Sequence, residues 1–128
     1  SQNIIYRSLW ERKFMNYCDL NENILEWASE EFWIPYLDPT TNRVRRYFPD
    51  FFIKYKDKDS NIRRSVIEVK PMRETLEPKT TKGKSRKTMI NESLTYVKNQ
   101  AKWKAAKEFC ADRKLEFKIM TEKELGIR

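Results

Sequence analysis

The chain has 128 residues, and 27 Lys and Arg against 19 Asp and Glu give it a formal net charge of +8. This length fits a single domain over residues 1–128. The basic excess favours a polyanionic partner, with nucleic acid as the first candidate. The sequence contains no histidine, which excludes Ser-His triads, His-metal nucleases and His-containing zinc sites.

The two cysteines and the apolar runs indicate the compartment. Cys18 and Cys110 are far apart and form no CxxC motif, so we expect two reduced thiols in the core. No apolar run is long enough to cross a bilayer, and we expect no membrane partner. A reducing cytoplasm is therefore predicted, or a particle assembled there. Because the sequence starts at Ser1 without an initiator Met, we also expect either that a short N-terminal extension is missing or that the chain has been processed.

The sequence of the first half of the chain predicts a helix followed by short strands. Ser8 is a candidate N-cap for a helix that ends near Cys18. Turn residues then separate short apolar segments, which predict a sheet that is mostly antiparallel at this edge. The expected strands are Ile24 to Glu30, Phe32 to Tyr36, Arg43 to Phe48 leading into a strand from Asp50, and Arg64 to Lys70, with turns at 21–23, 38–42 and 57–61.

The second half begins with a basic segment and continues into a long helix. Residues 78–88 predict a mobile basic loop, because they are rich in Lys and Arg, carry no acid and contain a glycine. The helix expected from about Lys87 to Arg113 has apolar residues at three- and four-residue spacing, which predicts a face turned to the core. That face comprises Ile90, Leu94, Val97, Ala101, Ala105 and Phe109. A strand at 116–119 and a terminal turn capped by Thr121 with Glu124 complete the chain.

Pro49-Asp50 and Glu68-Val69-Lys70 form the most informative motif. Alternate residues of a strand share a face, so Glu68 and Lys70 are predicted to point the same way. Carboxylates of Asp50 and Glu68, with the Val69 carbonyl, suit a Mg²⁺ ion that promotes phosphodiester hydrolysis. Lys70 would hold the attacking water or stabilise transition-state charge. The structural alternative is a turn aspartate and a solvated strand face.

Glu11 has two interpretations that the spacing leaves open. With Ser8 it forms Ser-x-x-Glu, the pattern of a capping box at a helix start. The functional interpretation makes Glu11 a third acid that reaches the metal site from the first helix.

Candidate DNA contacts come from basic and polar side chains. The basic loop is the best phosphate clamp, although it is also compatible with a merely solvated segment. Arg43 and Arg45 share one strand face and run toward Asp50. Gln100 lies with Tyr96 and Trp103 on a second helical stripe, which more often packs than stacks on bases. The predicted DNA-binding residues are Arg43, Arg45, Lys79, Lys82, Lys84, Arg86, Lys87 and Gln100.

Taken together, these segments resemble the PD-(D/E)xK nucleases. The motifs are Tyr6 to Glu11, Ile34 to Tyr36, Tyr47 to Phe51 and Ile67 to Pro71. They are similar to the transposon end-cleaving and junction-resolving branches, and residues 92–106 bring the chain nearer to the head-completion nucleases of T4-like bacteriophages. The resemblance implies an α/β (α+β) restriction-endonuclease-like core with a central mixed sheet flanked by helices. It also implies Mg²⁺ or Mn²⁺ dependence and places Glu11 with Asp50, Glu68 and Lys70 in the catalytic set.

The same resemblance implies a task. The chain would act as a metal-dependent endonuclease on double-stranded DNA, processing packaged ends in the host cytoplasm or the virion, with portal or neck proteins as partners. The alternatives are a junction-resolving or transposition-type nuclease and a non-catalytic neck protein that grips DNA. The oligomeric state stays open, since a dimer suits symmetric junction cutting and a monomer suits trimming of one end.

Overall fold

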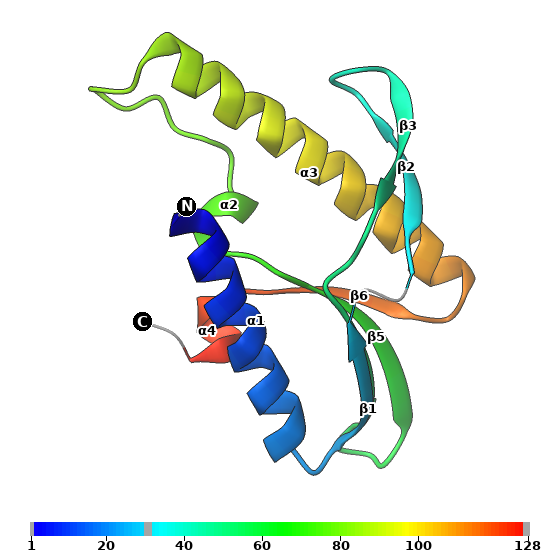
Figure 1. Cartoon of the computed structure of the whole chain (residues 1–128). Coiled ribbons are helices and arrows are strands. Elements are labelled where there is room, and N and C mark those ends of the chain that lie inside the picture. The colour runs from blue at the N-terminus through cyan, green and yellow to red at the C-terminus, as the bar shows by residue number, and fades with distance from the viewer. Residues whose placement is uncertain (1, 30–31, 127–128) are drawn as a thin grey trace.

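A computed structural model describes residues 2–29 and 32–126, which form a mixed sheet, a separate β-hairpin and flanking helices (Figure 1). The elements are α1 (Gln2–Leu20), β1 (Ile24–Ser29), β2 (Ile34–Asp38), β3 (Arg43–Tyr47), β4 (Phe51–Lys56), β5 (Ile62–Val69), α2 (Met72–Thr75), α3 (Arg86–Asp112), β6 (Glu116–Met120) and α4 (Glu122–Leu125). None of the described helices combines the length and the apolar character of a membrane span.

The main sheet has the strand order β1-β4-β5-β6. β4 pairs antiparallel with both β1 and β5, whereas β5 and β6 are parallel. This arrangement confirms the predicted mixed sheet with an antiparallel edge. In the β4–β5 register Phe51 lies opposite Ile67, so Asp50 and Glu68 are neighbours across the two central strands.

One face of the sheet packs against the helices at the two ends of the described chain. Alternate residues of β4 and β5 form a core with α1 and α4 on this face. The buried residues of this cluster are Phe14, Cys18, Phe51, Ile53, Ile67, Val69 and Leu125. Figure 1 shows α1, in blue, beside α4, in red. The first and last helices therefore close the same side of the sheet.

The start of α1 corrects a prediction. The helix begins at Gln2, six residues before Ser8. Ser8 is therefore inside the helix and is not its N-cap. The Ser-x-x-Glu pattern of Ser8 and Glu11 cannot form a capping box there, because such a box needs its serine at the helix boundary.

The opposite face of the sheet packs against α3 and the hairpin of β2 and β3. Its buried cluster joins Trp103 and Ala106 of α3 to Ile34, Tyr36 and Tyr47 of the hairpin. Figure 1 shows the hairpin beside the yellow-to-orange half of α3. β2 and β3 pair only with each other among the described strands. They do not extend the main sheet.

β2 lies two residues later than expected, and Asp38 belongs to it rather than to the following turn. The side chain of Asp38 organises that turn by accepting hydrogen bonds from the amide and the hydroxyl of Thr40, at 2.9 and 2.6 Å. Its carbonyl accepts from the amide of Asn42 at 2.7 Å. The expected end of the preceding strand at Glu30 lies outside the described residues.

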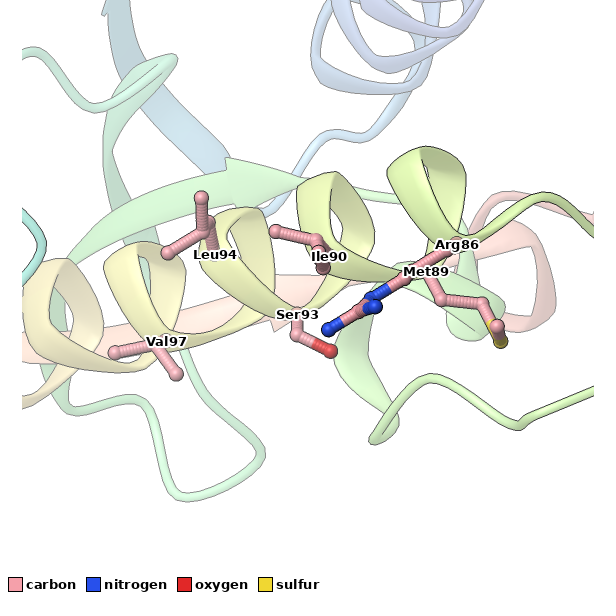
Figure 2. Close-up of a pocket in the computed structure, with 6 residues that line it drawn as sticks. All are labelled: Arg86, Met89, Ile90, Ser93, Leu94 and Val97. Atoms are coloured by element: carbon pink, nitrogen blue, oxygen red, sulfur yellow. The ribbon is translucent and has the colours of Figure 1, made fainter.

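The first half of α3 differs from prediction. Ile90, Leu94 and Val97 were expected in the core, but their side chains are 49%, 47% and 43% exposed. Figure 2 shows them with the other residues that line this surface, Arg86, Met89 and Ser93, all projecting from the same helix. The buried residues of α3 start only at Asn99. A helix of 27 residues extends beyond the sheet and the hairpin, so periodicity identified an apolar stripe without a layer to cover it.

Two further local predictions are confirmed, whereas the last three residues of the predicted basic loop at 78–88 belong to α3. Thr121 and Glu124 form a capping box at the start of α4. Cys18 and Cys110 are buried and free. Burial raises the pKa of the Cys18 thiol to about 12 and that of Cys110 to about 11, so both remain protonated and inert.

Candidate active site

Asp50 and Glu68 are both only 3% exposed, although each is a carboxylic acid. Asp50 directly precedes β4, and Glu68 is the penultimate residue of β5. The backbone amide of Val69 donates a hydrogen bond to Asp50 Oδ2 at 2.8 Å. The β4–β5 pairing and this bond together fix the aspartate beside the Glu68-Val69-Lys70 segment.

Glu68 lies between a phenol and an amine. The Tyr47 hydroxyl donates a hydrogen bond to Glu68 Oε2, and Lys70 Nζ lies 4.0 Å from Glu68 Oε1. The Lys70 side chain is 21% exposed, against 5% for that of Glu68. Glu68 and Lys70 therefore share a face, as predicted, while Ile67 and Val69 pack into the opposite core. The lysine presents its amine at the mouth of the site.

Tyr47 is a member of this site that sequence reasoning missed. Burial raises its pKa, and the charge of Glu68, the hydrogen bond to it and the charge of Asp50 act in the same direction. The buried indole N–H of Trp103 lowers the pKa of the hydroxyl, but its geometry falls short of a hydrogen bond. Lys102 Nζ lies 5.9 Å from the centroid of the Tyr47 ring. Tyr47 thus stays a hydrogen-bond donor at ordinary pH.

The donor set suits a hard divalent cation. Two adjacent buried carboxylates repel each other, and burial of such charges is unfavourable unless cations compensate them. Carboxylate oxygens are the ligands that Mg²⁺ and Mn²⁺ prefer. Asp50 and Glu68 fit this role, and the Val69 carbonyl lies in the segment that joins Glu68 to Lys70.

Glu11 is not brought into a three-acid cluster with this pair. It is a half-buried residue of α1, the helix that covers the face opposite Tyr47 and Glu68. Within residues 2–29 and 32–126, no three Asp, Glu or Cys side chains lie close enough to hold one metal ion. Asp50 and Glu68 are the two acids that the β4–β5 pairing places side by side.

The predicted DNA contacts on the hairpin are exposed and close to the site. Arg43 and Arg45 are exposed residues of β3. Arg45 Nε pairs with Asp38 at 3.0 Å, and Lys98 Nζ of α3 lies 3.6 Å from the same carboxylate oxygen. This buried aspartate therefore fixes the hairpin to α3 and orients one of the two arginines.

Some of the other predicted DNA contacts have exposed side chains, and one, Lys84, already binds other groups of the protein. Gln100 is exposed on α3, while Trp103 of the same stripe is 4% exposed and packs in the core. In the basic segment Lys84 Nζ binds Glu92 at 3.0 Å and the Lys79 carbonyl at 3.3 Å. The remaining predicted cations of this segment are exposed: Lys79, Lys82, Arg86 and Lys87.

Comparison with known proteins places this geometry in a family. The model of the family described as "TnsA-like endonuclease N terminal" matches residues 21–122, which include Asp50, Glu68 and Lys70. The chain belongs to this family. It is therefore an endonuclease-type domain with a restriction-endonuclease-like α+β fold, from a family that generally uses divalent metals.

A curated relative from a bacteriophage supports the same assignment. The chain is 38% identical over 122 residues to the "Head completion nuclease" of Enterobacteria phage T4, and the match covers 93% of this chain and 79% of that protein. No solved structure gives a significant match.

Proposed function

We propose that this chain is a Mg²⁺- or Mn²⁺-dependent endonuclease that hydrolyses phosphodiester bonds of double-stranded DNA during phage head completion. The observation that carries the proposal is the buried pair Asp50 and Glu68 with Lys70 Nζ 4.0 Å from the glutamate. The similarity to the T4 protein supports the phage role. On this proposal the chain acts on packaged DNA ends in the infected host cell or the virion, beside portal or neck proteins.

Asp50 and Glu68, with the Val69 carbonyl, would hold the metal ion. When bound, a divalent cation neutralises phosphate charge and makes a coordinated water more acidic. Tyr47 holds the Glu68 carboxylate in one orientation through its hydroxyl. Lys70, at the more exposed edge of the site, orients the attacking water or stabilises the negative charge that develops on the phosphate.

Glu11 is proposed as an additional acid that acts outside the Asp50–Glu68 pair. Its half-buried position on α1 and the resemblance to nucleases with a helical glutamate support this role. Glu11→Gln tests it, because a loss of cleavage without a change in melting temperature supports a functional carboxylate. An unchanged cleavage rate would restrict the site to Asp50, Glu68 and Lys70.

The DNA-binding role is proposed for the exposed basic residues that flank the site. Arg43 and Arg45 lie on the same hairpin strand as Tyr47. Lys79, Lys82 and Lys84 lie in the segment before α3, and Arg86, Lys87 and Gln100 lie on α3. Phosphate contacts of this kind position a duplex without reading its sequence. Low base specificity is therefore expected.

The experiment is cleavage of plasmid, linear and branched DNA with Mg²⁺, Mn²⁺ and EDTA. The wild-type protein should nick or cut with metal and not with EDTA. Asp50→Ala and Lys70→Ala should each reduce the rate roughly hundredfold or more while the variants stay folded by circular dichroism. Preference for branched DNA would favour a junction nuclease, and intact DNA in every reaction would favour a DNA-gripping neck protein.

A further inference from the structure

The outward face of the hairpin is apolar and carries no packing layer in the described structure. Alternation along β2 and β3 sends Ile34, Tyr36 and Tyr47 into the core. The residues between them point away from α3. Leu37 and Val44 lie opposite each other across the two strands and are 56% and 72% exposed.

Two aromatic rings lie at the end of this face that is nearest the active site. Trp33 immediately precedes β2 and is 45% exposed, and Phe48 immediately follows β3 and is 49% exposed. The guanidinium carbon of Arg46 lies 4.8 Å from the Trp33 ring centroid, so Trp33 is on the outward side with Arg46. Exposed aromatic rings beside arginines are typical of surfaces on which nucleic-acid bases stack.

Phe48 is close to Asp50 in the sequence, which sets an upper limit on the distance between their backbones. Phe48 is separated from Asp50 by one residue, a span of at most about 7 Å. Successive nucleotides of a strand are about 3.4 Å apart along the helix axis. The Phe48 backbone is therefore within about two nucleotide spacings of Asp50. Because bases inside a duplex already stack on each other, only an unpaired base can use such a ring.

The positive charge of the hairpin favours DNA, rather than a second copy of the chain, as the partner that covers the outward face. Arg43, Arg45 and Arg46 are exposed, and Asp38, the only acid between Trp33 and Phe48, is buried against Arg45 and Lys98. A symmetric pair of outward faces would bring the Arg46 guanidinium groups of two copies together, which is repulsive. A polyanion with exposed bases complements both the charge and the rings.

From these observations we propose that Trp33 and Phe48 form a stacking site for unpaired bases next to the cleavage position. The substrate class is then a duplex with a single-stranded extension or a locally unpaired strand. This inference rests on the proposed nuclease function, and it adds a preference for DNA structure to it.

The test is a binding experiment without divalent metal, so that no cleavage takes place. A blunt duplex is compared in EDTA with the same duplex carrying a short single-stranded extension. The extension is placed on one strand or on the other. Wild-type protein should bind an extended duplex more tightly. Trp33→Ala and Phe48→Ala should each weaken binding to the extended duplex roughly 5- to 100-fold and leave binding to the blunt duplex unchanged.

Matched variants separate stacking from general apolar contact. Trp33→Phe keeps a ring and should retain the preference, and Val44→Ala, on the same face, should not alter it. Equal binding of the two duplexes by the wild type would overturn the proposal, as would unchanged binding in both alanine variants. A dimer in sedimentation that Val44→Ala and Leu37→Ala abolish would show instead that the face is a protein interface. If the wild-type protein cleaves no DNA with metal, the nuclease function is overturned. The binding preference is measured in EDTA and is therefore an independent result.

Discussion

Glu68 lies beside a phenol that donates a hydrogen bond to it and an amine at ion-pair distance, and we propose separate roles for these two groups. Tyr47 is buried and approaches one carboxylate oxygen, whereas Lys70 is partly exposed and faces the other. A buried neutral donor fixes the direction of a carboxylate without adding charge. An exposed amine at the same group remains available to substrate. The orientation of the glutamate and the chemistry at the phosphate are thus assigned to different residues.

Tyr47→Phe tests the orienting role. The substitution keeps the ring in its core and removes only the hydroxyl. Affinity for Mn²⁺, measured by calorimetry, should fall by about 10- to 100-fold, the usual effect of losing a group that orients a ligand. Cleavage should fall in parallel. Tyr36→Phe, in the same buried cluster, is the control and should change neither. Equal metal affinity in Tyr47→Phe and the wild type would contradict the role.

Asp38 makes the attachment of the hairpin dependent on pH. The hydrogen bond from the Thr40 hydroxyl lowers the pKa of Asp38 to about 2, against the opposing effect of burial and with help from Lys98 and Arg45. An aspartate in the unfolded chain has its ordinary pKa of about 3.8. Because the folded value is the lower one, the stabilisation is fully present above pH about 4 and is lost as the pH falls toward about 2.

Asp38→Asn should therefore reduce stability most at neutral pH. Urea unfolding of the variant and the wild type at several pH values would measure the difference in the free energy of unfolding. The difference should be constant from pH about 7 to pH about 5 and shrink below pH about 4. A difference that does not change with pH would show that the charge of Asp38 has no part in the stabilisation.

Among the elements, α3 shows what periodicity can and cannot predict. The spacing of its apolar residues correctly indicated a long helix. Ile90, Leu94 and Val97 were assigned to the core, yet the helix extends past the layers that would cover them. Trp103, interpreted as packing rather than stacking, does lie in the core. A repeat of 3.6 residues identifies an apolar face, but a neighbouring element decides whether it is buried.

Substituting a buried and an exposed isoleucine compares the stability that an apolar side chain contributes in the core with what it contributes on the exposed face of α3. Ile67 in β5 is 0% exposed, and Ile90 in α3 is 49% exposed. Ile67→Ala should lower the free energy of unfolding by about 2–5 kcal/mol, while Ile90→Ala should change it by less than about 1 kcal/mol. Denaturant unfolding at one pH compares the two. Equal losses would mean that the exposed face of α3 is covered in solution.

The strands explain why so much of the site was predictable. Asp50, Glu68 and Lys70 are close in space because of local rules, namely alternation on a strand and pairing across a hairpin. Tyr47 was not predicted because its contact with Glu68 spans 21 residues and depends on how the hairpin packs against α3. Ser8 was misassigned since the helix has no sequence signal that fixes its start at Gln2.

At the scale of the whole molecule, 27 Lys and Arg exceed 19 Asp and Glu, and the hairpin, α3 and the segment before it carry part of these cations. Long-range attraction of this kind brings a polyanion to the surface without choosing its sequence. Not every cation contributes equally, because a lysine already paired with a glutamate releases fewer counterions from DNA than an exposed one.

Alanine variants of Lys79, Lys82 and Lys84 compare the contributions of exposed and paired lysines to DNA binding. Lys79→Ala and Lys82→Ala should each weaken duplex binding and reduce the slope of log affinity against log salt by about 1. Lys84→Ala should have a smaller effect, since Lys84 pairs with Glu92 at 3.0 Å. Fluorescence titrations in EDTA at several salt concentrations would measure the slopes. A larger effect of Lys84→Ala than of the other two would contradict this ranking.

The parallel pairing of β5 with β6 also links the segment of Lys70 to residues that come much later in the sequence. The amide of Lys70 donates to the Met120 carbonyl at 3.0 Å, and the Met72 amide donates to Glu122 Oε1 at 2.8 Å. The segment that carries the catalytic lysine is thus completed by residues translated about fifty positions later. A nascent chain that has not reached Met120 lacks the strand that supports this lysine. We therefore expect the proposed nuclease to become active only after this strand has been synthesised.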